Sequence, residues 1–103
     1  MMSIGQELVG HLVVVRDNMA GVHFGRLAEF DAASKSASII DARKVWYWRG
    51  AASCHGLAAR GLDHDGSKVC PVVSRVTMTN VVEVIACSSD GAVSLGAAPE
   101  WKP

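Results

Sequence analysis

Short apolar runs, separated by polar or glycine-containing turns, make up most of this 103-residue chain. Runs of this kind that are rich in Val and Ile are typical of β-strands. Six segments carry the pattern: residues 8–16, 21–30, 37–42, 43–48, 69–78 and 80–87. They predict a single domain over residues 1–103, with an α+β but mostly β fold and a small antiparallel, barrel-like sheet. A flexible N-terminus is expected over about residues 1–7.

Two further segments predict short helices. Residues 54–60 (CHGLAAR) lie between Ser53, a residue type favoured at helix N-caps, and Gly61, which suits the position after a helix. Residues 88–91 can cap a second helical turn that extends to Leu95. We therefore expect one sheet with one or two short helices.

Single positions refine this picture. Leu12 and the three valines that follow it are apolar on consecutive positions, which predicts a strand buried on both faces or the centre of a small barrel. Gly25 interrupts the second strand, so a bulge, a sharp bend or the close approach of another backbone or a ligand is expected there. Asp41 is expected to turn the chain before the next strand. Trp101 is expected to dock onto the body and seal an open end of the core.

The strand at residues 43–48 (RKVWYW) is the most distinctive part of the chain. Alternation along a strand places Arg43, Val45 and Tyr47 on one face and Lys44, Trp46 and Trp48 on the other. The two tryptophans therefore line a groove if Val45 faces the core. The pattern allows the reverse arrangement equally well.

Charge and cysteine content exclude several classes of protein. Ten Lys and Arg residues balance ten Asp and Glu residues, so a binder of duplex nucleic acid, which usually carries a basic excess, is not expected. Three cysteines without C-x-x-C spacing favour unpaired thiols in a reducing cytoplasm. Because the chain shows neither a signal-peptide pattern nor an apolar run of roughly 20 residues, we expect a cytoplasmic protein without a membrane segment.

Patterns that support catalysis or metal binding are weak. Cys54 and His55 are adjacent, and neighbours on a helix point about 100° apart, so they do not form a nucleophile–base pair by themselves. The four histidines lack the spacing of a metal motif, and the D-H-D-G sequence at residues 63–66 lacks the remaining ligands of a calcium loop. No enzyme activity, metal or cofactor is therefore predicted.

Anion binding is the chemistry that the aromatic segment suggests. A helix that begins after Ser53 offers unpaired N–H groups to a phosphate, and Gly50 and Ala51 are small enough for a ligand to approach the backbone. Arginines can hold phosphate oxygens, and aromatic rings can stack on a base. The predicted ligand-binding residues are Arg43, Trp46, Trp48, Arg49, Gly50, Ala51 and Ser53, with His23 close by.

The same residues have other possible uses. Aromatic strands frequently belong to a core, and Ser53 can be a plain helix cap. Aromatic and Arg side chains also anchor protein interfaces, so the tryptophans can bury against another copy of the chain, and a homo-oligomer is expected. A ligand site and an oligomer are compatible.

Four motifs point to a known group of proteins: G-V-H-F-G at residues 21–25, D-A-R-K-V-W-Y-W-R-G-A-A-S at 41–53, E-V-I at 83–85 and P-E-W at 99–101. From about residue 12 to residue 101, the chain resembles a family of small phage- and prophage-encoded proteins of undefined function. The W-Y-W-x-G-A-A-S block is the most specific part of this resemblance. The family supplies no catalytic residues.

The resemblance implies a phage accessory protein that acts in the cytoplasm of the host cell. Small phage proteins of this kind often counter host defence, and some sequester cyclic nucleotides that serve as immune signals. By that analogy, the expected ligand is a small anionic, nucleotide-derived molecule such as a cyclic nucleotide. The alternatives are a protein–protein inhibitor of a host defence system, a structural accessory protein with an aromatic interface, and a hydrolase of a nucleotide signal.

Overall fold

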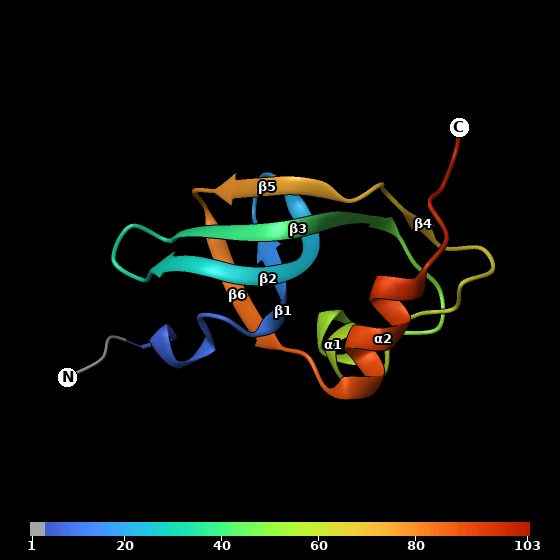
Figure 1. Cartoon of the computed structure of the whole chain (residues 1–103), viewed down its shortest axis with the longest axis horizontal. Coiled ribbons are helices and arrows are strands. Elements are labelled where there is room, and N and C mark those ends of the chain that lie inside the picture. The colour runs from blue at the N-terminus through green and yellow to red at the C-terminus, as the bar shows by residue number, and fades with distance from the viewer. Residues whose placement is uncertain (1–3) are drawn as a thin grey trace.

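A computed structural model describes residues 4–103 as one curled sheet with two short helices on its outer face (Figure 1). This confirms the predicted mostly β, α+β fold. The elements, in chain order, are η1 (Gln6–Leu8), β1 (Leu12–Asp17), β2 (Gly21–Asp31), β3 (Ser36–Tyr47), α1 (Cys54–Arg60), β4 (Lys68–Val69), β5 (Val73–Met78), β6 (Val81–Ala86) and α2 (Ser89–Ala97). Met1–Ser3, part of the segment expected to be flexible, lie outside the described residues, whereas Gln6–Leu8 form a 3₁₀ turn.

The sheet follows the order β4-β3-β2-β1-β6, with β5 pairing with β3 next to β4, and all of these pairings are antiparallel. Only Thr79 and Asn80 separate β5 from β6, although these two strands belong to opposite ends of the strand order. The sheet must therefore curl to bring its two edges together. Within residues 4–103, β5 and β6 do not pair, so the sheet is barrel-like in its curvature but is not closed.

The core has two parts because β1 is covered on both faces. Val13 and Val15 point to the inside of the curled sheet, where they join Leu27, Ile39 and Met78. Val14 points the other way. It belongs to the cluster that includes, from the helices, Leu57 and Leu95. All three valines are fully buried, which confirms the interpretation of their run as a central strand.

The segment at residues 37–48 forms one strand rather than the two that we predicted. Asp41 does have the left-handed backbone (φ 49°) of a turn residue, but it produces a bulge instead of a reversal. Phe24 pairs with Arg43 and Arg26 with Ile40, so two residues of β3 face Gly25 alone. A Cβ at Gly25 would lie 2.9 Å from the Ile40 carbonyl oxygen, which explains the glycine. The bulge bends β3 around the inner core.

The other elements follow local signals. Helix α1 begins after Ser53, whose Oγ accepts a hydrogen bond from the Gly56 N–H, and it ends at Gly61, as predicted. Ser88 caps α2 in the same way through the Gly91 N–H. The predicted strand at 69–78 is split into β4 and β5 around Pro71, which has no N–H to donate.

The packing of α2 on α1 yields the first prediction. A Cβ at Gly91 would collide with the Ala58 carbonyl, whereas the nearest atom to a Cβ at Gly96 is a Phe24 ring carbon 4.0 Å away. Gly91→Ala should therefore destabilise the protein by about 1–3 kcal/mol, the usual cost of overpacking. Gly96→Ala is the matched control on the same helix and should be neutral or stabilising by up to about 1 kcal/mol. Urea unfolding followed by circular dichroism measures both. Equal stabilities of the two variants would contradict this helix contact.

Candidate functional site

Two tryptophans distant in sequence stack on each other at the surface. The Trp46 and Trp101 ring centroids are 5.1 Å apart, and the ring planes differ by 17°. Trp46 is 53% exposed and Trp101 is 37% exposed, so much of the pair faces solvent. We call this surface, with the neighbouring Tyr47 and Lys68, the tryptophan platform.

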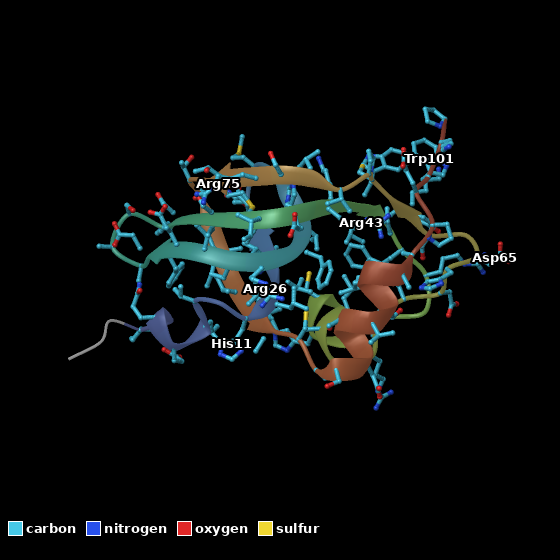
Figure 2. The ribbon with its side chains drawn as sticks, viewed as in Figure 1. His11, Arg26, Arg43, Asp65, Arg75 and Trp101 are labelled. Atoms are coloured by element: carbon cyan, nitrogen blue, oxygen red, sulfur yellow. The ribbon has the colours of Figure 1, made fainter. Side chains whose placement is uncertain are left out.

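Three elements bring the platform together. Trp46 points outward from β3 because its neighbour Val45 points into the core. Lys68 lies opposite Tyr47 in the pairing of β3 with β4. The C-terminal tail then runs parallel to β4: Glu100 bridges Val69, and the Trp101 N–H donates to the Val69 carbonyl oxygen at 2.9 Å. Figure 2 shows Trp101 on this tail, outside the sheet.

The Lys68 ammonium completes the platform. Its Nζ lies 4.7 Å from the Trp46 ring centroid, 4.9 Å from that of Trp101 and 5.8 Å from that of Tyr47. These distances are typical of cation–π contacts, which hold the ammonium against the rings. Flat apolar surface and a positive charge therefore occur within one small area. That combination can stack a planar group and pair with an anion attached to it.

Arg43, one of the predicted ligand residues, is placed elsewhere. It is only 4% exposed, and it lies between the sheet and α2 (Figure 2). Its Nε donates to the Cys70 carbonyl at 3.0 Å, and its Nη1 donates to the carbonyls of Leu95 at 3.0 Å and Gly96 at 3.4 Å. Burial lowers the pKa of Arg43, while Glu100 and Cys70 work in the opposite direction. The Nε and Nη1 donors of Arg43 therefore bind backbone carbonyls within the protein and do not face a ligand on the platform.

Trp48 and Trp46 do not line one groove, because β3 ends at Tyr47 and the chain turns. Trp48 is half-buried against the core, and its Nε1 donates to the Ala51 carbonyl oxygen at 3.2 Å. The Arg49 backbone is occupied as well: its N–H donates to Ser67 Oγ at 3.0 Å, and its carbonyl accepts from the Asp63 N–H at 2.8 Å.

The remaining residues of the predicted set also have structural roles. Gly50 has φ 88°, and a Cβ there would collide with Asp63, so this position needs glycine. The Ser53 hydroxyl is engaged as the cap of α1. The structure therefore brings only Trp46 of the predicted residues onto the platform, while the others hold the loops around α1, the core and the end of α2.

A hollow of about 460 Å³ lies beside α1 and includes Trp48 and Ser53 in its lining. Glu83 also lines it and contacts both Arg16 Nε at 3.1 Å and His55 Nε2 at 2.9 Å. The hydrogen bond from His55 is the main cause that lowers the pKa of Glu83, with Arg16 contributing. Burial raises the pKa of the neighbouring Cys54 thiol, which disfavours the nucleophilic thiolate.

His23 lies inside the curled sheet, away from the platform. It is buried on β2 between Val15 and Lys44, and its Nδ1 has no hydrogen-bond partner among residues 4–103. Burial is the main cause that lowers its pKa. The charge of Lys44 adds to this effect, whereas that of Asp17 opposes it. The neutral imidazole is therefore the form that the fold accommodates.

Neither Lys68 nor Trp101 was predicted as a binding residue. Lys68 ends a polar segment that looks like a solvated loop. Trp101 docks onto the body, as predicted, but it stacks on Trp46 at the surface instead of sealing an open end of the core. The outward orientation of Trp46 was one of two allowed alternatives. Nothing local indicates that the tail pairs with Val69, since that contact joins segments about 30 positions apart.

Other chemistry has little support in the part of the chain that the structure describes. Residues 4–103 contain no group of three or more His, Cys, Asp or Glu side chains arranged to hold a metal ion. Neither α1 nor α2 has the length and apolar character needed to cross a membrane.

The buried state of His23 leads to a prediction about pH. Its pKa is lowered in the fold, so the unfolded chain binds this proton first, and stability should fall as pH drops below about 6.5, the ordinary value. Urea unfolding at pH 7.5 and pH 5.5 measures this effect. Between these two values, the free energy of unfolding should decrease less for His23→Gln than for the unmodified protein. His11→Gln, at an exposed position, serves as the control and should leave the pH dependence unchanged. A pH profile unaffected by His23→Gln would contradict this assignment.

Comparisons with known proteins place the chain in a family. Residues 10–95 match the family described as Domain of unknown function (DUF6948). The comparisons with curated proteins and with solved structures found no match. The family match includes every strand from β1 to β6 and the whole of α1, which is most of the chain. The protein therefore belongs to the DUF6948 family.

Proposed function

We propose that this protein binds, without chemical turnover, a small anionic and nucleotide-derived ligand on the tryptophan platform. The observation that carries the proposal is the position of the Lys68 ammonium, 4.7 Å and 4.9 Å from two exposed and stacked indole rings. A nucleotide combines the two features that this surface complements, a planar base and a phosphate.

The energetics favour such a ligand. Stacking of one base on an aromatic side chain contributes about 1–3 kcal/mol. The ammonium of Lys68 is held at the ring surface, so it is already close to the phosphate of a stacked nucleotide. The protein as a whole carries no net charge, so its attraction for anions has to come from this local arrangement.

Sequestration is the biological role that follows from binding without turnover. The sequence motifs resemble phage-encoded proteins, and a phage protein that titrates a cyclic nucleotide signal would weaken a host defence that depends on that signal. We accordingly propose an anti-defence sponge that acts in the host cytoplasm. A sponge needs a tight site rather than a catalytic group.

A protein partner is the second candidate. Tyr47 is 50% exposed beside Trp46, and Val72 and Val73, in the segment after β4, are also exposed. Exposed aromatic and aliphatic side chains are typical of the central part of a protein interface. The partner would be a host defence protein, another phage component or a second copy of the chain.

Titration with candidate ligands tests the first proposal. The full chain is titrated with cyclic mono-, di- and trinucleotides and with ADP-ribose derivatives, by calorimetry and by tryptophan fluorescence. We expect one of these classes to bind and to quench the emission, because Trp46 and Trp101 would stack on the base. Ligand recovered unchanged after denaturation separates binding from hydrolysis. If no compound binds at micromolar protein concentration, the nucleotide proposal is wrong, and capture of a partner protein becomes the next test.

Two substitutions locate the site. Lys68→Gln should weaken binding by about tenfold or more, since loss of a charge-assisted contact costs about 1.5 kcal/mol or more. Arg49→Ala serves as the comparison, because its side chain lies against Gly66 and is not one of the platform residues, and this variant should weaken binding less than Lys68→Gln. Calorimetry on both variants measures the difference, with urea unfolding as the check that each is folded. If Arg49→Ala weakens binding more than Lys68→Gln does, the ligand binds at the loop before α1 and not on the platform.

A further inference from the structure

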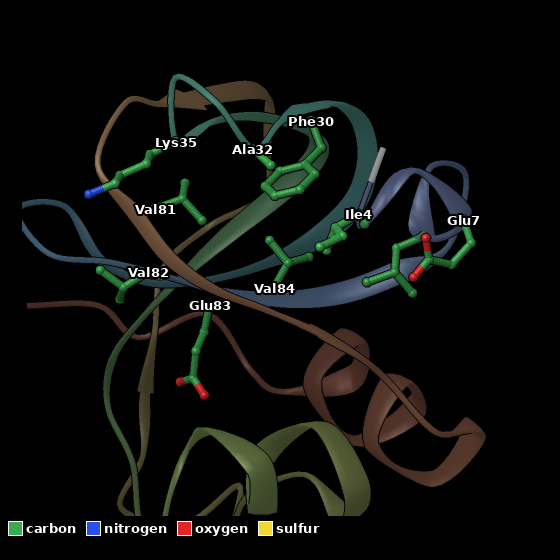
Figure 3. A pocket seen from close by; sticks show the side chains of 11 residues that line it. Ile4, Glu7, Phe30, Ala32, Lys35, Val81, Val82, Glu83 and Val84 are labelled. Atoms are coloured by element: carbon green, nitrogen blue, oxygen red, sulfur yellow. The ribbon is translucent and has the colours of Figure 1, made fainter. Parts of the chain in front are cut away.

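The unclosed seam of the sheet leaves a groove beside β6. In the described part of the chain, β6 pairs with β1 alone, so its other edge has no strand partner, although the Val81 N–H at its start donates to the Lys35 carbonyl oxygen. A pocket of about 290 Å³ opens along that edge (Figure 3). Its lining comes from η1 and the two residues before it, from the end of β2 and the hairpin that follows, and from β6 itself.

Specific contacts keep the two walls of the groove in place. At one end, the Val81 N–H donates to the Lys35 carbonyl oxygen at 2.9 Å, which ties the hairpin to the start of β6. At the other, Gln6 Nε2 donates to the Phe30 carbonyl oxygen and holds η1 against β2. A side chain at Gly5 would collide with the Phe30 ring, so η1 is packed as closely as its backbone allows.

The groove is apolar along its length and charged at its ends. Phe30, Val81 and Val84 line its inner part, and Figure 3 shows their side chains gathered around the opening. Lys35 lies toward one end and Glu7 toward the other (Figure 3). Within residues 4–103, neither of these two exposed charges takes part in an ion pair.

Val82 adds an apolar contact at the rim. The pairing of β6 with β1 shifts between Arg16 and Asp17, which leaves Val82 as an extra residue. Its side chain is 48% exposed, and Ile4 on the facing wall is 87% exposed. An occupant of the groove would cover both of these aliphatic side chains.

We propose that this groove binds an extended peptide segment of another protein, which adds to the sheet as a strand beside β6. Backbone hydrogen bonds to the edge would supply affinity, and alternate apolar side chains would enter the groove. The charges at the ends of the groove favour a peptide with complementary charges. Such a peptide has an acidic residue at the Lys35 end and a basic residue at the Glu7 end.

The geometry favours a separate peptide over a second copy of the chain. The edge of β6 lies between η1 and the hairpin, so a partner's β6 would arrive flanked by the same two elements. Those elements would collide before the two edges reached the roughly 4.8 Å spacing of paired strands. A single extended segment brings no such flanking elements.

Selection from a displayed random peptide library tests the proposal. The full chain is immobilised and presented with peptides of roughly six to ten residues, the length of an ordinary strand. We expect the selected sequences to alternate apolar and polar residues, with an acid near one end and a base near the other. Fluorescence polarisation with the synthesised peptides then gives affinities. If nothing is enriched, or if enriched peptides lack the alternation, the proposal is overturned.

Variants determine where and in which direction the peptides bind. Val82→Lys should weaken binding at least tenfold, whereas Val93→Lys, at an exposed position on α2, should have no effect. Exchanging the two end charges, by Glu7→Lys with Lys35→Glu, should invert the preferred order of acid and base in the selected peptides. Lys68→Gln should not change peptide binding, which keeps this test separate from the nucleotide site.

Two results would overturn the proposal even if some peptides bind. The first is peptide affinity unaffected by Val82→Lys, which would place the contact elsewhere. The second is a dimer of the chain in size-exclusion chromatography with light scattering that Val82→Lys dissociates, which would assign the edge to a second copy. Urea unfolding confirms that each variant remains folded before its binding is interpreted.

Discussion

The buried guanidinium of Arg43 is the interaction on which the arrangement of the helices, the tail and the platform depends. It extends from β3 and donates hydrogen bonds to the carbonyls of Cys70, Leu95 and Gly96. These carbonyls belong to the connection between β4 and β5 and to the last turn of α2. One side chain thus joins three segments that are separated in sequence. Burial of such a charge is costly unless it is hydrogen-bonded, and here Nε and Nη1 both donate to carbonyl oxygens.

This interaction also completes α2. The last turn of a helix exposes unpaired carbonyls and a partial negative charge, and a basic side chain there is stabilising. Helix α2 has no basic residue in its own last turn. Arg43 supplies that charge from the sheet. Because the C-terminal tail leaves α2 directly after Gly96 and Ala97, Arg43 also fixes where Trp101 begins its approach to Trp46.

Local signals explain what the sequence analysis predicted well. Ser53 and Gly61 define α1 because a cap acts on residues next to it, and Val13 to Val15 revealed a central strand because burial on both faces leaves a continuous apolar run. Long-range contacts explain what it missed. The value of φ at Asp41 is that of a turn, and only the pairing with β2 makes it a bulge. Arg43 looks like a ligand residue until the distant carbonyls around it are known.

Strand β3 connects the two proposed binding surfaces. Its first residues leave the hairpin that forms one wall of the β6 groove, and its last residues carry the tryptophan platform. Strand β3 has twelve residues, and the longest dimension of the molecule is 43 Å. The surfaces therefore lie near opposite ends of the molecule, as Figure 1 shows for the hairpin and the C-terminal tail. A nucleotide and a peptide at that separation do not compete for space. If both proposals hold, one bulged but continuous strand would link two sites that can be filled at the same time.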